Sequence, residues 1–440
     1  MLPHRSLDRL ATRFDDGHAL AYAGLIQPAT LAERLGLRAL FDEYVRLGSA
    51  PGHAHVGHKA MTLIHSALAG GECIDDADAL RAGGTEAVLG HELRAPSTLG
   101  TFLRSFTWGH VRQLDRVAGH LLARAWQAGA GPGGEPVTID VDSTICETYG
   151  LAKQGARFGY SGVRGYHPLL ASVAGGGEVV HARLRGGNAY SGRGAASFVT
   201  EAVARVRSAG ASGRLTLRAD SGFYSRTVVD ACRRAHVYFS ITVKLQPSLR
   251  RAIEAIPEEH WTAIPYWNEG GADVAATGYV PFGEKREVRL IVRRVRPTPG
   301  TQLALLTHYS HHAFITDREG ETLELEADHR RHAEVENMVR DLKYGVGLNH
   351  LPSGRFAANG AWLVLNVIAH NLARWVARIG LGTKTMLTTR TLRRRLLALP
   401  GRLTRSARTW TLHLPRDWPW ANAFIAALQR LRAIPPPLRV

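Results

Sequence analysis

Two segments that read as buried strands carry aspartates at or near their ends. In VTIDVDST the alternation of apolar residues predicts a strand that places Asp140 and Asp142 on one face. Asp220 ends the apolar run RLTLRA before a Ser-Gly turn, and the carboxyl ends of strands in open α/β sheets are where ligand sites form. A charge in a buried strand is costly unless it is paired or binds metal. Taken alone, each aspartate also fits a cap or an Asx-turn.

A third acidic residue, Glu336, lies in the segment HRRHAEVENMVRDLK, which has helical periodicity. At about 100° per residue, one arc of roughly 80° carries His329, His332, Glu336, Arg340 and Lys343. The opposite side carries Val335, Met338 and Leu342. One face therefore packs while the other presents two imidazoles, a carboxylate and two cations, although a solvated helix face explains the same pattern.

These carboxylates, taken together, suit one chemistry. Carboxylates from separate elements can hold a pair of Mg²⁺ ions, one activating a water or a 3′-hydroxyl and the other stabilising the leaving oxygen. Lys343 is then placed to contact a phosphate beside the site. The charge balance agrees, because 55 Lys and Arg against 38 Asp and Glu give +17, which suits a polyanionic partner. Ribosomal and membrane-surface proteins share such a balance.

Other classes of site are absent from the sequence. Cys73, Cys146 and Cys232 lie far apart without a Cys-x-x-Cys pair, which excludes a zinc-finger or disulfide framework. His308, His311 and His312 cluster without the His-Glu-x-x-His of zinc hydrolases, and no Gly-x-Ser-x-Gly elbow occurs. A tyrosine recombinase is disfavoured as well, since no His-x-x-Arg precedes a suitable late Tyr. The start lacks an apolar signal core and no run of about 18 apolar residues exists, so we expect a soluble cytoplasmic protein without membrane contact.

The elements that must position these residues predict an α/β chain in several parts. Residues 1–127 read as helical, and a helix-turn-helix DNA reader and a packing or dimer domain are equally compatible with that pattern. The glycine-rich segment 128–136 is a joint. We expect the parts to be 135–225 (strands and a helix), 226–322 (β-rich), 323–380 (helical) and 381–440 (a basic helical tail that includes Arg393, Arg394 and Arg395).

The segments IDVDST, RADSGFYS and 329–343 resemble the three catalytic blocks of DDE transposases from bacterial insertion sequences. The most similar group has a ribonuclease-H-like core, a β-strand insertion before the final Glu and a helix signature Tyr-x2-Arg-x3-Glu-x6-Lys. Here His329 and His332 stand at the Tyr and Arg positions, and Arg331 is interpreted as a partial substitute. Further similar segments are 158–171, 184–192, 356–375 and APSTLGTFLRSF, so the resemblance spans roughly residues 20–380.

The resemblance implies a transposase that binds element ends and catalyses metal-dependent cleavage and strand transfer. Its metal ligands and catalytic residues are Asp142, Asp220 and Glu336, with two Mg²⁺ ions or Mn²⁺ in their place; Asp142 is preferred over Asp140 because the first block of the family reads Asp-x-Thr. The implied DNA-binding residues are His329, Arg331, His332, Arg340, Lys343, Arg393, Arg394 and Arg395. The implied partners are duplex DNA with terminal inverted repeats, target DNA and a second copy of the chain.

Two alternatives remain open at this stage. A metal-dependent nuclease or resolvase with the same core would use the same carboxylates but would hydrolyse DNA without strand transfer. A DNA-binding transposase relic would bind without activity, and the two histidine substitutions keep this alternative open. The bacterial resemblance places the protein in the cytoplasm, at the nucleoid when bound to DNA.

Overall fold

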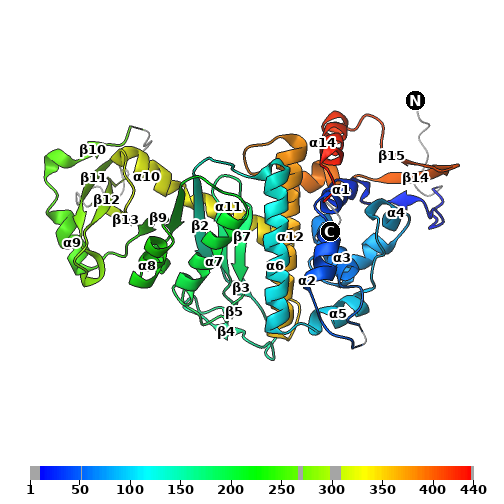
Figure 1. The fold of residues 1–440 in the computed structure, drawn as a ribbon, viewed down its shortest axis with the longest axis horizontal. Coiled ribbons are helices and arrows are strands. Elements are labelled where there is room, and N and C mark those ends of the chain that lie inside the picture. The colour runs from blue at the N-terminus through cyan, green and yellow to red at the C-terminus, as the bar shows by residue number, and fades with distance from the viewer. Residues whose placement is uncertain (1–9, 51, 266–270, 298–308, 438–440) are drawn as a thin grey trace.

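A nine-stranded mixed sheet runs from one end of the computed structural model to its middle (Figure 1). The structure describes residues 10–50, 52–265, 271–297 and 309–437. The strand order is β10-β11-β12-β13-β9-β8-β2-β6-β7. The strands are β2 (Val137–Ser143), β6 (Leu169–Val173), β7 (Val179–Arg183), β8 (Leu215–Ala219), β9 (Tyr238–Thr242), β10 (Thr262–Ala263), β11 (Ala272–Tyr279), β12 (Val288–Val295) and β13 (Ser310–Thr316). Only β2, β8 and β9 run parallel to one another; the other neighbours are antiparallel.

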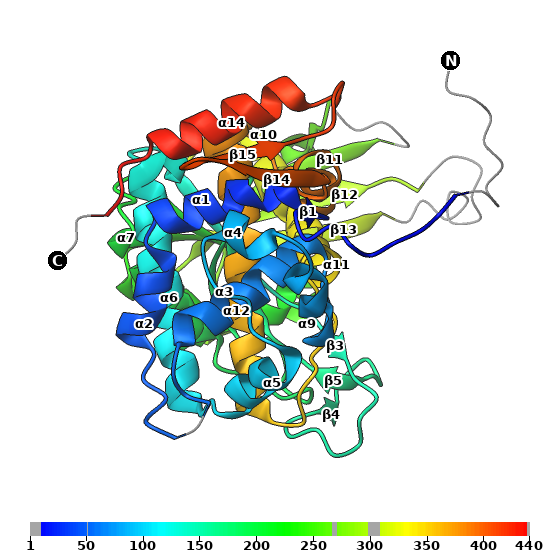
Figure 2. The same cartoon turned by 90° about the vertical axis from the view of Figure 1, so that its right-hand side faces the viewer.

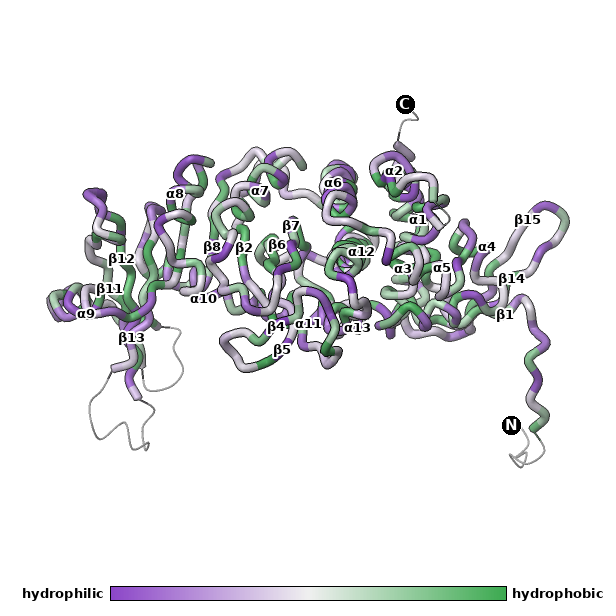
Figure 3. Tube along the Cα trace, turned by 90° about the horizontal axis from the view of Figure 1, so that it is seen from below, coloured by the Kyte–Doolittle hydropathy of each residue, from purple (hydrophilic) through white to green (hydrophobic). Residues whose placement is uncertain are grey.

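The parallel strands are covered on both faces, which explains why their apolar residues are buried. All five residues of β8 are buried, as are the apolar residues of β2. Figure 3 shows α7 (Ala195–Ser208) on one side of these strands and α11 (Val335–Gly345) on the other. α7 continues into β8, and α8 (Arg226–Arg234) connects β8 to β9. The mixed α/β class expected from the sequence is confirmed.

A long buried helix, α12 (Phe356–Trp375), links the sheet to the N-terminal helices. Every residue from Ala358 to Trp375 is buried, and α12 contacts β7 on one side and α3 and α6 on the other (Figure 1). The N-terminal helices are α1 (Ile26–Arg34), α2 (Leu37–Tyr44), α3 (Val56–Ala69), α4 (Thr85–Leu89), α5 (Pro96–Arg104) and α6 (Trp108–Ala125). Their apolar side chains belong to the same continuous core as those of the sheet, so α12 fixes the two parts against each other.

The glycine-rich joint after α6 is a sequence of turns. Gly129 has φ of 103° and Gly133 has φ of 62°, values that side chains with a Cβ rarely adopt. The backbone N–H of Ser212 also donates to Gly133 O at 3.3 Å. These glycines therefore reverse the chain between α6 and β2.

The β-rich part differs from the expected insertion in where it starts and in how it packs. We expected it to begin at residue 226, but α8 and β9 continue the parallel part of the central sheet. β13 then pairs antiparallel with β9, so β10 to β13 extend the same sheet and leave no strand edge open at β9. Helix α9 (Pro247–Glu254) packs beside them. Most of the expected strand QLALLTHYS lies outside the described residues.

The C-terminal part is not uniformly helical, contrary to the expected helical tail. It contains α13 (Thr389–Leu392), a π-helical turn η11 (Arg393–Leu397), the hairpin β14 (Gly401–Ser406) and β15 (Thr409–His413), and α14 (Ala421–Ala433). Threonines and alternating exposure favour strands at the hairpin, and β14 also pairs with β1 (Ala19–Leu20). α14 lies over α1 (Figure 2).

Across the described ranges, no helix is both long and apolar enough to cross a membrane. Cys73, Cys146 and Cys232 are free thiols, the last two buried.

Candidate active site

Asp142 and Asp220 lie at the carboxyl ends of two neighbouring parallel strands. β2 and β8 pair in register up to the residue before each aspartate. The backbone N–H of Ser143 donates to Asp142 Oδ1 at 2.7 Å, and that of Gly222 donates to Asp220 Oδ1 at 2.8 Å. Each carboxylate is thereby oriented by its own turn through one oxygen, and no ion pair to either carboxylate exists within the described part of the chain.

Glu336 reaches the same site from the first turn of α11, where its side chain is exposed. The pKa of Asp142 is raised to about 6, chiefly by burial and further by the negative charges of Asp220 and Glu336, while the Ser143 amide and His332 oppose the rise. Like charges interact this way only at short range. The structure therefore places Asp220 and Glu336 close enough to Asp142 for their negative charges to act on it.

The chemistry of this donor set fits a hard divalent cation. Mg²⁺ takes oxygen ligands, and three mutually repelling carboxylates are stabilised by a positive charge placed among them. Within residues 10–50, 52–265, 271–297 and 309–437, no three His, Cys, Asp or Glu side chains are already arranged to hold an ion. The charges of Asp220 and Glu336 act on Asp142, but the three carboxylates do not form a closed set of metal ligands.

A buried charge network lies on the same face of β2, one strand period before Asp142. Asp140 and Arg218 are 2% and 1% exposed. Arg218 donates from Nε to Asp140 Oδ1 at 2.6 Å and from Nη2 to Asp140 Oδ2 at 2.8 Å. His332 Nδ1 lies 2.9 Å from the same Oδ1, and Arg218 also donates to the backbone oxygen of Asp328. The network therefore joins β2 and β8 to the segment that precedes Glu336.

Arg218 was missed by the analysis of the sequence, although a signal for it exists. It lies two residues before Asp220 and thus on the same strand face, in a run that is otherwise apolar. A buried guanidinium requires a carboxylate partner, and Asp140 occupies the matching register position on β2.

Comparison with known proteins decides the family. The sequence matches the family described as "Transposase DDE domain group 1" over residues 3–436. This chain belongs to that DDE transposase family. The expected resemblance to DDE transposases is thus confirmed, and with it a role in cutting and joining DNA; the family generally uses divalent metal ions.

Two further comparisons are with a solved structure and with curated proteins. The structure is similar to a piggyBac transposase in a synaptic complex with hairpin DNA, with a TM-score of 0.47, 9% sequence identity, and coverage of 85% of this chain and 79% of that chain. No curated protein matches the chain.

The helix that carries Glu336 is wound differently from the single helix expected over 329–343. α10 (Thr322–Arg330) passes through a 3₁₀ turn, η9 (Arg331–Glu334), into α11. A 3₁₀ turn has about 3.0 residues per turn instead of 3.6, so four residues rotate the following face by roughly 80° relative to an α-helix. The angle between His329 and Glu336 around the axis therefore changes from about 20° to roughly 60°.

His329 packs against the extended part of the sheet. Its ring stacks on Phe314 with centroids 4.0 Å apart, and its two nitrogens lie 2.7 Å from Ser240 Oγ and 2.9 Å from Thr242 Oγ1. Burial lowers the pKa of His329 well below 6.5, so the ring is neutral near pH 7. These contacts give His329 a packing role, which differs from the DNA contact expected from the sequence.

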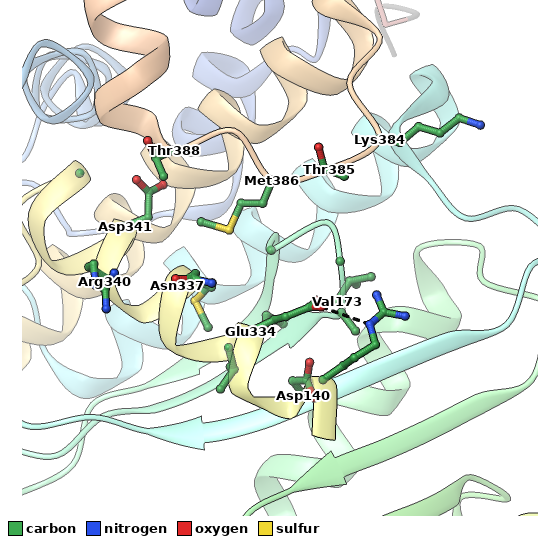
Figure 4. A pocket seen from close by; sticks show the side chains of 18 of the residues that line it. Asp140, Val173, Glu334, Asn337, Arg340, Asp341, Lys384, Thr385, Met386 and Thr388 are labelled. Atoms are coloured by element: carbon green, nitrogen blue, oxygen red, sulfur yellow. Dashed lines mark hydrogen bonds and ion pairs between the residues drawn. The ribbon is translucent and has the colours of Figure 1, made fainter. Parts of the chain in front are cut away.

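The cations of α11 and η9 lie on two flanks of the helix. Lys343 Nζ donates to Ile145 O at 2.7 Å and ties α11 to the chain just beyond β2. On another flank a groove of about 790 Å³ runs between α11, the β6–β7 turn and residues 384–390 (Figure 4). Its cationic lining is Arg331, which pairs with Glu334 at 3.2 Å, together with Arg340, Lys384 and Arg390. Val173, Met338 and Met386 line its apolar part.

The three tail arginines have different surroundings. Arg393 donates to the backbone oxygens of Ala67, Leu68 and Gly345, so its guanidinium holds η11 against α3 and α11. The Arg395 guanidinium lies over the Trp420 ring, 5.6 Å from its centroid. Arg394 is exposed. Of the expected phosphate contacts in the tail, the structure leaves Arg394 the most accessible.

Proposed function

We propose that this chain is a DNA transposase that binds the ends of its element and catalyses metal-dependent strand cleavage and strand transfer. The observation that carries the proposal is the convergence of Asp142, Asp220 and Glu336 in a member of a DDE transposase family. The strand order β7-β6-β2-β8-β9, with the last three parallel, supports a ribonuclease-H-like core. We further place the chain among bacterial insertion-sequence transposases with a Tyr-Arg-Glu-Lys type of helix.

In this proposal Asp142, Asp220 and Glu336 hold two Mg²⁺ ions, or Mn²⁺ in their place. The bound ions supply an activated water or 3′-hydroxyl and stabilise the leaving oxygen. The amides that orient Asp142 and Asp220 fix two of the ligands before DNA arrives. The contact of Lys343 with Ile145 fixes α11 relative to β2, and so limits where Glu336 can lie. Such preorganisation is what a phosphoryl-transfer site requires of the protein.

The proposed DNA partners are the terminal inverted repeats and then the target duplex. Arg331, Arg340, Lys384 and Arg390 line the groove beside α11, and Arg394 is exposed in the tail. Phosphate contacts from such side chains position the duplex without reading its sequence. We assign end recognition or dimer contacts to residues 1–127, because pairing two DNA ends needs two copies of the chain.

The test uses a labelled duplex that carries the inverted repeat, with Mg²⁺ or Mn²⁺ and a target plasmid. Products joined to the plasmid are the expected result. Nicked products without joining would favour a nuclease of the same fold, and binding without any cleavage would favour an inactive relic. In either case strand transfer would be excluded as the activity of this chain.

A further inference from the structure

Five large apolar or aromatic side chains are exposed close to the candidate active site. Tyr149, Leu151, Phe158, Tyr160 and Tyr190 are 86%, 88%, 67%, 81% and 68% exposed. We call them the aromatic platform. The first four come from the small sheet β3-β5-β4 and its loops (β3, Cys146–Glu147; β4, Arg157–Phe158; β5, Arg164–Tyr166), and Tyr190 comes from the loop after β7. Exposed apolar groups that gather on adjoining loops mark a binding surface.

Close backbone packing joins the two parts of the platform. The N–H of Gly187 donates to Gly155 O at 3.2 Å. A Cβ on Gly187 would lie 2.2 Å from the backbone oxygens of both Arg157 and Gly165, which no side chain tolerates. The Gly-Gly pair in LRGGNAYSG therefore exists to seat the 186–193 loop directly on the β4–β5 hairpin.

A buried arginine then fixes this loop. Arg185 is 8% exposed. Its Nη1 lies 2.9 Å from Tyr190 O, 3.1 Å from Ser191 O and 2.9 Å from Arg193 O, and its Nε donates to His167 O at 2.9 Å. A loop held by so many bonds to one buried side chain loses little entropy when it binds a partner. Tyr190 is thus an exposed ring on a rigid support.

The fixed loop also contacts both strand ends of the active site. Ser191 Oγ lies 3.1 Å from Oγ of Ser143, the residue after Asp142. A Cβ on Gly222, two residues after Asp220, would lie 2.7 Å from Ser191 Cβ. Tyr190 is therefore the neighbour in sequence of Ser191, which contacts the residue after Asp142. The strands β4 and β5, which carry the rest of the platform, project on the α11 side of the sheet in Figure 3.

We propose that the aromatic platform stacks unpaired nucleotides of the DNA that borders the cut, an inference that rests on the proposed function. In a duplex the base faces are covered by their neighbours, so only unpaired nucleotides can use exposed rings. The charge agrees with this ligand, because Lys153, Arg157 and Arg164 accompany a single acid, Glu147, between residues 144 and 166. Exposed Arg157 and Arg193 flank the rings and can contact the intervening phosphates.

The experiment measures binding of two DNAs by fluorescence anisotropy without divalent metal, so that catalysis plays no part. One is the element-end duplex with a blunt flank, and the other carries a short unpaired flank containing 2-aminopurine. Tyr190→Ala and Phe158→Ala should each weaken binding of the flanked DNA by roughly tenfold, leave the blunt duplex unchanged and reduce the 2-aminopurine quenching. Tyr190→Phe should keep both signals because it keeps the ring.

Trp410→Ala is the matched control, because Trp410 is an aromatic side chain, 52% exposed, on the distant hairpin strand β15. Equal loss on both DNAs, or no loss on the flanked DNA, would overturn the stacking role. Loss of stacking with strand transfer intact would leave the proposed function standing. If the wild type shows flank-dependent binding but never joins DNA, the stacking role would stand and the proposed function would be overturned. Wild-type protein that binds neither DNA would overturn both.

Discussion

Asp140 and Asp142 lie two residues apart on the same face of β2, yet their surroundings have opposite charge. Asp140 is bound by Arg218 through two hydrogen bonds and by His332 through a third. Asp142 has two carboxylates, Asp220 and Glu336, and the ring of His332 as its charged neighbours, and an amide as its hydrogen-bond donor. The first site is compensated within the protein, whereas the second is left with excess negative charge.

This contrast separates the acid that is paired within the fold from the acid that we propose as a metal ligand. A buried, paired carboxylate joins elements and strongly penalises the loss of either partner. A carboxylate whose neighbours repel it gains most from a cation that the fold does not contain. The two sites are also coupled, because His332 contacts Asp140 and at the same time lowers the pKa of Asp142. His332 therefore belongs to the structural network but acts electrostatically on the active site.

The largest expected effect comes from removing one of the three proposed metal-binding carboxylates. Asp142→Ala, Asp220→Ala or Glu336→Ala should each lower cleavage on the order of 10³-fold or more, because several kcal/mol of transition-state stabilisation is lost. Single-turnover cleavage measures the loss, and anisotropy should show nearly unchanged affinity for end DNA. Glu334→Ala is the matched control, since Glu334 is exposed close by and pairs with Arg331. Full activity of Glu336→Ala would move the third ligand to Glu334.

Breaking the paired site should mainly cost stability. Asp140→Ala and Arg218→Met each remove the main partner of a buried charge, which should lower the free energy of unfolding by about 3–5 kcal/mol. The double variant Asp140→Leu, Arg218→Met should lose much less than the sum of the two. Denaturant unfolding without metal measures all three. Cleavage by Asp140→Ala should fall about 10–100-fold through His332. Strictly additive losses would contradict a paired role.

The pH dependence of stability tests the unpaired site without DNA. The pKa of Asp142 in the folded protein, about 6, lies above its ordinary value of 3.8. The folded state thus keeps this proton where the unfolded chain has lost it, so the contribution of Asp142 to stability is present below about pH 4 and is lost as the pH rises through about 6. Metal-free wild type should lose about 3 kcal/mol across this window relative to Asp142→Asn.

Thermal unfolding at a series of pH values gives this difference. Added Mg²⁺ should reduce it, because a bound cation lowers the pKa of the carboxylate. Identical pH profiles for wild type and Asp142→Asn would show that Asp142 is not held among like charges.

The smallest expected effect extends the contrast from carboxylates to cations. Arg394→Ala should reduce the slope of log affinity against log salt by about 1 without changing stability, as expected for one lost phosphate contact. Arg393→Ala should lower stability by about 1–3 kcal/mol, because the carbonyls it satisfies would lose their donor. Binding titrations between low and high salt, paired with unfolding curves, separate the two. If only Arg393→Ala changed the salt slope, Arg393 and not Arg394 would be the phosphate contact.

The sequence by itself indicated the family and led to the proposal of the three carboxylates, because both depend on short-range order. The blocks IDVDST and RADSGFYS place an acid at a strand end through period-two alternation and a following turn. The family match confirms the resemblance that these blocks indicated. The parallel pairing of β2 and β8 then brings the two aspartates to adjacent positions, as strands of one open sheet allow.

Only the tertiary structure decided which aspartate is paired, because Arg218 is 78 residues from Asp140 in the chain and meets it only through strand register. The angle between His329 and Glu336 around the helix axis depended on the 3₁₀ turn before α11, whose winding no α-helical periodicity predicts. Likewise, the segment from α8 to β9 joins the parallel sheet, and residues 401–413 form a hairpin paired to β1, through partners distant in sequence. Local pattern fixes which residues share a face, whereas partner choice depends on contacts that exist only after the chain has folded.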